Sequence, residues 1–69
     1  MINWQLLALQ LRKHCGPLGA VAKKLGKHPQ WLNELARGEI REPKHMDGTR
    51  LLDFASDHLP IEVLRGCRQ

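Results

Sequence analysis

The chain has 69 residues, a formal net charge of +4 and a sequence pI of about 9.6. A chain of this length forms one small domain that buries too little surface to enclose a deep catalytic cleft, so we expect a binding module and not an enzyme. The charge is one-sided, because no acidic residue precedes Glu34 and the same segment holds Arg12, Lys13, Lys23, Lys24 and Lys27. Such a segment favours a polyanion such as DNA as the partner, although an ordinary solubilising surface has the same composition.

The two cysteines, Cys15 and Cys67, are far apart in the sequence. The first residues lack the features of a secretory signal peptide, and no apolar run approaches the roughly 20 residues that a membrane-spanning helix needs. We therefore expect a cytoplasmic protein with reduced thiols. Neither the cysteines nor the four histidines have the close spacing of zinc ligands, so we predict no metal, no cofactor and no nucleophilic cysteine.

The spacing of apolar residues predicts four or five helices and no strand. The first is expected over residues 3–14, with Asn3 as its N-cap. Its inward face comprises Trp4, Leu7, Ala8, Leu11 and Cys15. Gly16 and Pro17 end this helix. The second is expected over residues 17–25, and Gly26 follows its apolar stripe of Leu18, Val21, Ala22 and Leu25.

The third helix is expected over residues 29–37, with His28 as its N-cap, and Gly38 closes it. Its inward residues are Leu32, Leu35 and Ala36. After a loop over residues 39–45, a fourth helix over residues 46–58 is expected to bury Leu51, Leu52, Phe54 and Ala55. Pro60 opens a short fifth helix that reaches about Gly66, with Ile61 and Leu64 packing back.

The segment GAVAKKLG at residues 19–26, followed by KHPQWLNELARG at residues 27–38, resembles the helix-turn-helix of phage repressors and Cro proteins. It is most similar to the prophage-encoded Cro-like and antitoxin-like members, and the run RLLDFA from Arg50 extends the likeness. The resemblance implies an all-α, compact four- to five-helix lambda-repressor-like domain over residues 1–69, with the helix-turn-helix at about residues 18–38. Many relatives begin the second helix with a Thr or Ser cap and a phosphate-holding Gln, where this chain has Pro17 and Leu18.

In this arrangement the outward residues of the third helix face the major groove. The predicted base contacts are His28, Gln30, Asn33, Glu34 and Arg37. Amide side chains both donate and accept, which suits adenine, while a carboxylate can accept from cytosine or else pair with Lys27 or Arg37. The predicted phosphate contacts are Lys27, Arg41 and Lys44. Each of these residues also fits an ordinary solvated surface.

The two tryptophans have structural interpretations. Trp31 is expected to close the core against the fourth helix, with stacking on the sugar-phosphate backbone as the alternative. Trp4 is expected in the core or in a dimer contact. Large aromatic side chains supply much of the buried area in small domains, which favours the core in both cases.

The resemblance implies a cytoplasmic, sequence-specific regulator of transcription that binds double-stranded DNA, as a phage or prophage Cro-like repressor acting by promoter occupancy without a small-molecule effector. One helix-turn-helix reads a short half-site, so a homodimer on a near-palindromic operator is expected. The apolar residues left for a dimer contact are Leu59, Ile61, Val63 and Leu64. The alternative is an antitoxin-like protein-interaction module that also binds its own promoter, which the short segment after the last expected helix disfavours.

Overall fold

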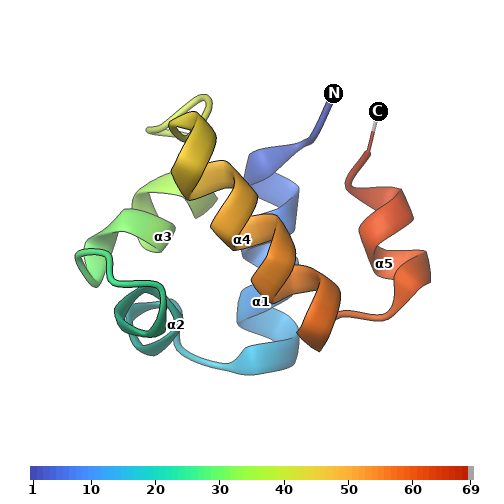
Figure 1. The fold of residues 1–69 in the computed structure, drawn as a ribbon, viewed down its shortest axis with the longest axis horizontal. Coiled ribbons are helices and arrows are strands. Elements are labelled where there is room, and N and C mark those ends of the chain that lie inside the picture. The colour runs from blue at the N-terminus through green and yellow to red at the C-terminus, as the bar shows by residue number, and fades with distance from the viewer. Residues whose placement is uncertain (69) are drawn as a thin grey trace.

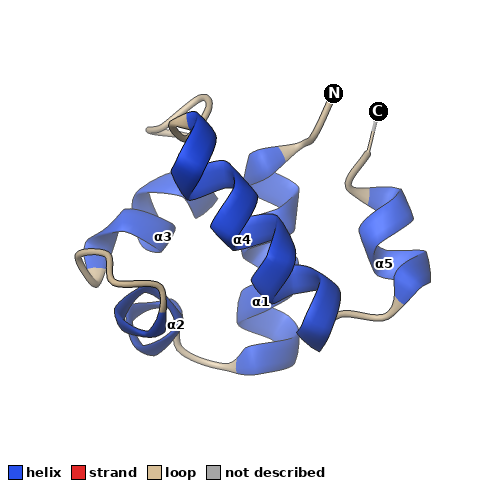
Figure 2. Ribbon diagram, in the orientation of Figure 1, coloured by secondary structure: helices blue, strands red, loops and turns tan. Residues whose placement is uncertain are grey.

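The structure is a computed structural model that describes residues 1–68, and it contains five helices joined by short connections (Figures 1 and 2). They are α1 (Trp4–Cys15), α2 (Leu18–Lys24), α3 (Gln30–Ala36), α4 (His45–His58) and α5 (Ile61–Gly66). Within residues 1–68 no segment forms a strand. The predicted all-α class is therefore confirmed, with five helices.

The helices are arranged around α1. Helices α2 and α3 pack on each other and on α1, whereas α4 packs on α1 from another side (Figure 1). Helix α5 follows α4 and lies at the end of the molecule opposite α2 and α3 (Figure 1). The longest dimension of the molecule, 28 Å, runs in this direction. The α2–α3 pair and α5 therefore occupy its two ends.

The start of α1 follows the predicted capping chemistry. Asn3 has an extended backbone, and its side-chain Oδ1 accepts a hydrogen bond of 3.0 Å from the N–H of Leu6. This bond satisfies one of the N–H groups that the first helical turn leaves without a partner. Helix α1 ends at Cys15, and the N–H of Gly16 donates to the carbonyl of Arg12. The predicted N-cap is confirmed.

Where the helix bounds differ from the predicted ones, they differ by one residue. Pro17, Pro29 and Pro60 precede α2, α3 and α5 instead of forming their first residues. Helix α4 begins at His45, which was predicted to lie in the preceding loop. Helix ends fray and are defined by terminal hydrogen bonds, so apolar spacing alone does not locate them.

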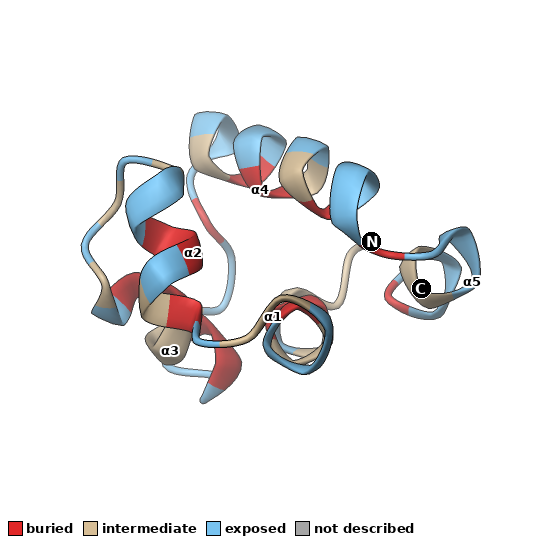
Figure 3. Cartoon of the chain, turned by 90° about the horizontal axis from the view of Figure 1, so that it is seen from below, coloured by how far each residue is buried: buried red, intermediate tan, exposed pale blue. Residues whose placement is uncertain are grey.

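The core is built mainly from leucines on the predicted inward faces. The fully buried ones are Leu7, Leu11, Leu18, Leu32, Leu35 and Leu51. On α4 the expectation is met only in part, because Leu51 and Ala55 are buried while Leu52 and Phe54 are half-buried. Figure 3 shows the buried stretches of α1 to α4 turned toward one another, with α5 largely exposed.

The segment around α5 contradicts two predictions. Ile61 does not pack back on the core, since 59% of its surface is exposed. Leu59 was expected on a dimer surface but is only 6% exposed and belongs to the core. Leu59 and Pro60 have an extended backbone and turn the chain between α4 and α5. As a result, the side chain of Leu59 points inward and that of Ile61 points outward.

The two ends of the described chain are joined. The N–H of Asn3 donates to the carbonyl of Cys67 at 2.7 Å, and Ile2 and Arg68 form an isolated antiparallel bridge. Cys67 is 2% exposed, and its burial raises the pKa of the thiol. Among residues 1–68, no helix has the length and apolar character needed to cross a bilayer.

Candidate nucleic-acid interface

The turn between α2 and α3 brings the two helices close together. Gly26 has a φ of 73°, in the left-handed region that favours glycine, and the N–H of Lys27 donates to the carbonyl of Ala22 at 2.9 Å. Ala22 is fully buried, and a Cβ on Gly19 would lie 3.6 Å from the Cβ of Pro29. Small residues on α2 thus permit the close approach of the start of α3.

Helix α3 is anchored by one face only. Its buried residues are Trp31, Leu32, Leu35 and Ala36. The side chain of Gln5 on α1 fixes the other end of the helix, because its Nε2 donates to the carbonyl of Ala36 at 3.1 Å. The opposite face is open, with exposed Gln30 and half-exposed Asn33 and Glu34. This face forms a polar strip that is free to meet a partner.

The N-cap of α3 is Pro29 and not the predicted His28, but His28 still bonds to the first turn. Its Nδ1 accepts a hydrogen bond of 3.1 Å from the N–H of Gln30, and its carbonyl accepts from the N–H of Trp31 at 2.9 Å. In the neutral ring, an accepting Nδ1 leaves the proton on Nε2. Since the residue is exposed, that Nε2–H is a donor available to solvent or to a ligand.

Arg37, at the end of α3, forms an exposed ion pair with Glu39. The hydrogen bond to Glu39 raises the pKa of the guanidinium, and the charge of Glu34 adds a smaller contribution in the same direction. Neither predicted partner of Glu34 pairs with it, because Arg37 binds Glu39 and Lys27 binds Asp47. The carboxylate of Glu34 therefore remains half-exposed on the polar strip.

Lys27 is held at the turn. Its Nζ lies 2.9 Å from Oδ2 of Asp47 on α4 and 5.3 Å from the centroid of the Trp31 ring, and 31% of its side chain is exposed. Trp31 is 9% exposed, which confirms its predicted place in the core. Of the predicted phosphate contacts, Lys27 is thus the one whose charge is already compensated by a carboxylate.

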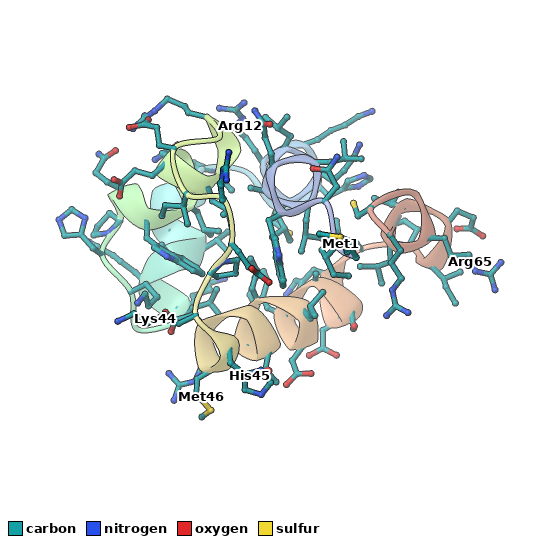
Figure 4. The ribbon with its side chains drawn as sticks, turned by 90° about the horizontal axis from the view of Figure 1, so that it is seen from above. Met1, Arg12, Lys44, His45, Met46 and Arg65 are labelled. Atoms are coloured by element: carbon teal, nitrogen blue, oxygen red, sulfur yellow. The ribbon has the colours of Figure 1, made fainter. Side chains whose placement is uncertain are left out.

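The other two predicted phosphate contacts, Arg41 and Lys44, are exposed. Lys44 precedes α4 one turn before Asp47, and Figure 4 shows it at the end of the molecule that carries α2 and α3. Arg41 borders a hollow together with Gly38, two residues after the end of α3, and with Trp4, which is half-buried. Both cations are therefore accessible to a polyanion.

The start of α2 carries no polar side chain suited to an anion. Leu18 is 2% exposed and belongs to the core, and Pro17 offers no donor. The sequence departs from the phage-repressor pattern at this position because Leu18 packs in the core, where the pattern has a polar residue.

Sequence reasoning missed three of the residues that shape the interface, namely Gln5, Glu39 and Asp47. Asp47 is 20 residues from Lys27 and Gln5 is 31 residues from Ala36, so no local pattern indicates either contact. Glu39 lies two residues from Arg37, and its opposite charge was a signal that could have indicated the pair.

Comparisons with protein-family models, with curated proteins and with solved structures found no match. The side chains of residues 1–68 include no group of three or more His, Cys, Asp or Glu residues placed to hold a metal ion. The interpretation of the interface therefore depends on the polar strip of α3 and the cations around it.

Proposed function

We propose that this chain is a sequence-specific regulator of transcription that binds double-stranded DNA, with α2 and α3 acting as a helix-turn-helix. The observation that carries the proposal is the one-sided anchoring of α3, which buries Trp31, Leu32, Leu35 and Ala36 and leaves a polar strip outside. A helix held in this way can enter the major groove without rearrangement of the core. Repression by occupancy of a promoter, as in the Cro-like proteins that the sequence resembles, is the simplest regulatory mode.

The residues of the polar strip, and the polar residues near it in the sequence, suit different contacts with DNA. Gln30 and Asn33 can each donate to and accept from adenine, and Glu34 can accept from the amino group of cytosine. His28 offers its Nε2–H near the start of the helix. Arg37 can reach a guanine or a phosphate once it leaves Glu39. Lys44 and Arg41, which are both exposed, neutralise phosphates.

The assignment of Gln30 and Asn33 is tested by binding to two duplexes, one enriched from a random-sequence library and one scrambled. Gln30→Ala and Asn33→Ala should each weaken binding to the enriched duplex by about 1–3 kcal/mol. Binding to the scrambled duplex should remain as it is, because phosphate contacts supply it. Gln10→Ala, on α1, is the matched control and should change neither. Unchanged discrimination in both α3 variants would remove these side chains from the readout.

We further propose that the protein acts as a homodimer on a near-palindromic operator. With Leu59 buried, the contact centres on exposed Ile61, beside a hollow of about 400 Å³ that Leu64 and Arg65 also line. Arg65 and Arg68 are exposed at this corner, as are the acidic Asp57 and Glu62. A two-fold axis places the same patch against itself, so opposite charges from the two copies can meet around the apolar centre.

The same exposed apolar corner is the observation that favours the alternative, an antitoxin-like module that docks a second protein and binds its own promoter. The two possibilities differ in the occupant of the Ile61 surface. Purification from the native host at low concentration distinguishes them. A stoichiometric second small protein that is released by Ile61→Gln would favour the antitoxin-like module, whereas recovery of the chain with itself alone would favour the dimer.

A further inference from the structure

Three parts of the molecule meet at the amino group of Lys27. The residue belongs to the turn before α3, its Nζ binds Asp47 on α4 at 2.9 Å, and it lies over the ring of Trp31 on α3 at 5.3 Å from the centroid. The Asp47 side chain is 18% exposed, so the pair is largely shielded from solvent. A partly desolvated ion pair and a cation–π contact reinforce one another in this position.

This arrangement makes Lys27 a poor ligand for phosphate. To reach a DNA backbone, the amine would have to leave a carboxylate and an aromatic face, so a new ion pair would replace an existing one. Lys44, at the same end of the molecule but exposed, has no such cost. Lys27 and Asp47 together have a net charge of zero. The pair therefore adds little to the attraction of the protein for a polyanion.

The contact instead joins the turn before α3 to α4, in addition to the one hydrophobic core that α1 to α4 share. Helices α2 and α3 pack on each other and on α1, whereas α4 packs chiefly on α1 and α5. Trp31 directly follows Gln30, so a movement of the start of α3 that carries the indole away from Lys27 also moves the first residue of the polar strip. The ion pair thus fixes the end of α3 from which bases would be read.

We propose that Lys27 is a positioning residue, which sets the orientation of α3 by joining the turn to α4 through Asp47 and the ring of Trp31. The inference rests on the proposed function, because it concerns how α3 is presented to DNA. It replaces the earlier expectation that Lys27 contacts phosphate.

The preference of Asp47→Asn for the enriched over the scrambled duplex separates the two roles. If Lys27 bound phosphate, loss of the carboxylate would free the amine and strengthen binding to both duplexes alike, which leaves this preference unchanged. If Lys27 positions α3, Asp47→Asn and Lys27→Met should each lower the preference for the enriched over the scrambled duplex by about fivefold. The double variant should be no worse than either single one. Lys27→Arg, which keeps the charge, should restore most of the preference.

The salt dependence of binding supplies the second readout. Lys27→Met should leave the slope of log K against log salt unchanged, while the control Lys44→Met should reduce it by up to about 0.9. Leu9→Ala is a second control, because Leu9 lies on α1 and packs against the core away from Lys27, Trp31 and Asp47. It should destabilise the fold and leave the preference for the enriched over the scrambled duplex intact. All variants are compared well below their unfolding midpoints, so loss of folded protein does not enter.

Thermal unfolding of the free protein keeps the inference separable from the proposed function. The cycle of Lys27→Met, Asp47→Asn and the double variant should be non-additive, with each single change lowering Tm by about 4–8 °C. Additive effects, or a smaller salt slope in Lys27→Met, would overturn the positioning role. If the unaltered protein does not bind DNA, the proposed function is overturned, and so is the role of Lys27 in orienting α3 toward DNA. Non-additive unfolding would in that case still support the ion pair between Lys27 and Asp47 as a stabilising contact.

Discussion

Arg37 reaches the end of the polar strip with its charge already compensated by Glu39, two residues further along the chain. Both side chains are exposed, so the pair contributes little to stability but does set the charge that α3 offers. We predict that Glu39→Gln strengthens binding to any duplex, by a few-fold at low salt, since it removes a repelling carboxylate and frees a guanidinium. Gel-shift titrations over a range of salt concentrations should show a slope steeper by up to about 0.9.

The matched control for this change is Glu62→Gln on α5, which alters the net charge equally at the other end of the molecule. A similar gain in both variants would mean that total charge matters and that Arg37 makes no contact of its own. A gain confined to Glu39→Gln places Arg37 at the DNA.

At the level of residues, the sequence indicated which side chains of α3 point outward, because a helix with Leu32, Leu35 and Ala36 inside leaves Gln30, Asn33 and their neighbours outside. It did not indicate which charged residues are already paired. The partner of Lys27 is 20 residues away, and such a contact depends on how the elements pack and not on local spacing. The helical period thus predicts which side chains of α3 point outward, but it does not predict which charged side chains are already in an ion pair.

The turn between α2 and α3 depends on Gly26, whose φ is 73°. We predict that Gly26→Ala lowers the free energy of unfolding by about 1–2 kcal/mol, although a Cβ at this position would meet no atom within 4 Å. The cost comes from the backbone conformation and not from a clash. Urea unfolding followed by far-UV circular dichroism measures it.

Gly66→Ala is the control for that prediction, because its Cβ would also meet open space but its φ lies outside the left-handed region. Alanine at the end of α5 should be neutral or stabilising by up to about 1 kcal/mol. Equal losses at both glycines would show that the turn has no special requirement at Gly26.

Among the elements, α1 to α4 could be predicted because each carries enough apolar residues to define one face. Helix α5 has six residues, and its apolar Ile61, Val63 and Leu64 do not share a single stripe. Its inward side is decided by the extended turn at Leu59 and Pro60 and by the bond between Asn3 and Cys67, which joins the two ends of the chain. Contacts this distant in sequence are not visible in the local pattern, which is why Leu59 was assigned to the surface and Ile61 was expected to pack back on the core.

Across the whole molecule, the two proposed surfaces are separated along the longest axis. Figure 4 shows Lys44 near one end and Arg65 at the other, and this axis measures 28 Å. Two copies joined through α5 would extend over as much as twice 28 Å, or 56 Å, which leaves room for two α3 helices one turn of DNA, about 34 Å, apart. The position of Ile61 is thus compatible with a dimer that reads two half-sites on one side of the duplex.

We therefore predict that Ile61→Gln weakens dimerisation while leaving the monomer folded, because Ile61 is 59% exposed and contributes little to the core. A two-fold axis loses the side chain twice, so a loss of about 2 kcal/mol corresponds to roughly 30-fold in the dimer dissociation constant. Sedimentation equilibrium measures this constant, and titration of an inverted repeat against a single half-site shows whether cooperative binding is lost and half-site binding retained.

Met46→Gln is the control for the dimer, since Met46 is 66% exposed and lies at the opposite end of the molecule from α5. Both substitutions introduce the same neutral side chain, so neither alters the attraction for DNA phosphates. The dimer surface lies on α5 if Ile61→Gln alone shifts the equilibrium. If Met46→Gln dissociates the protein instead, the two copies meet through the start of α4, and α3 would then lie too close to the two-fold axis for two half-sites one turn apart.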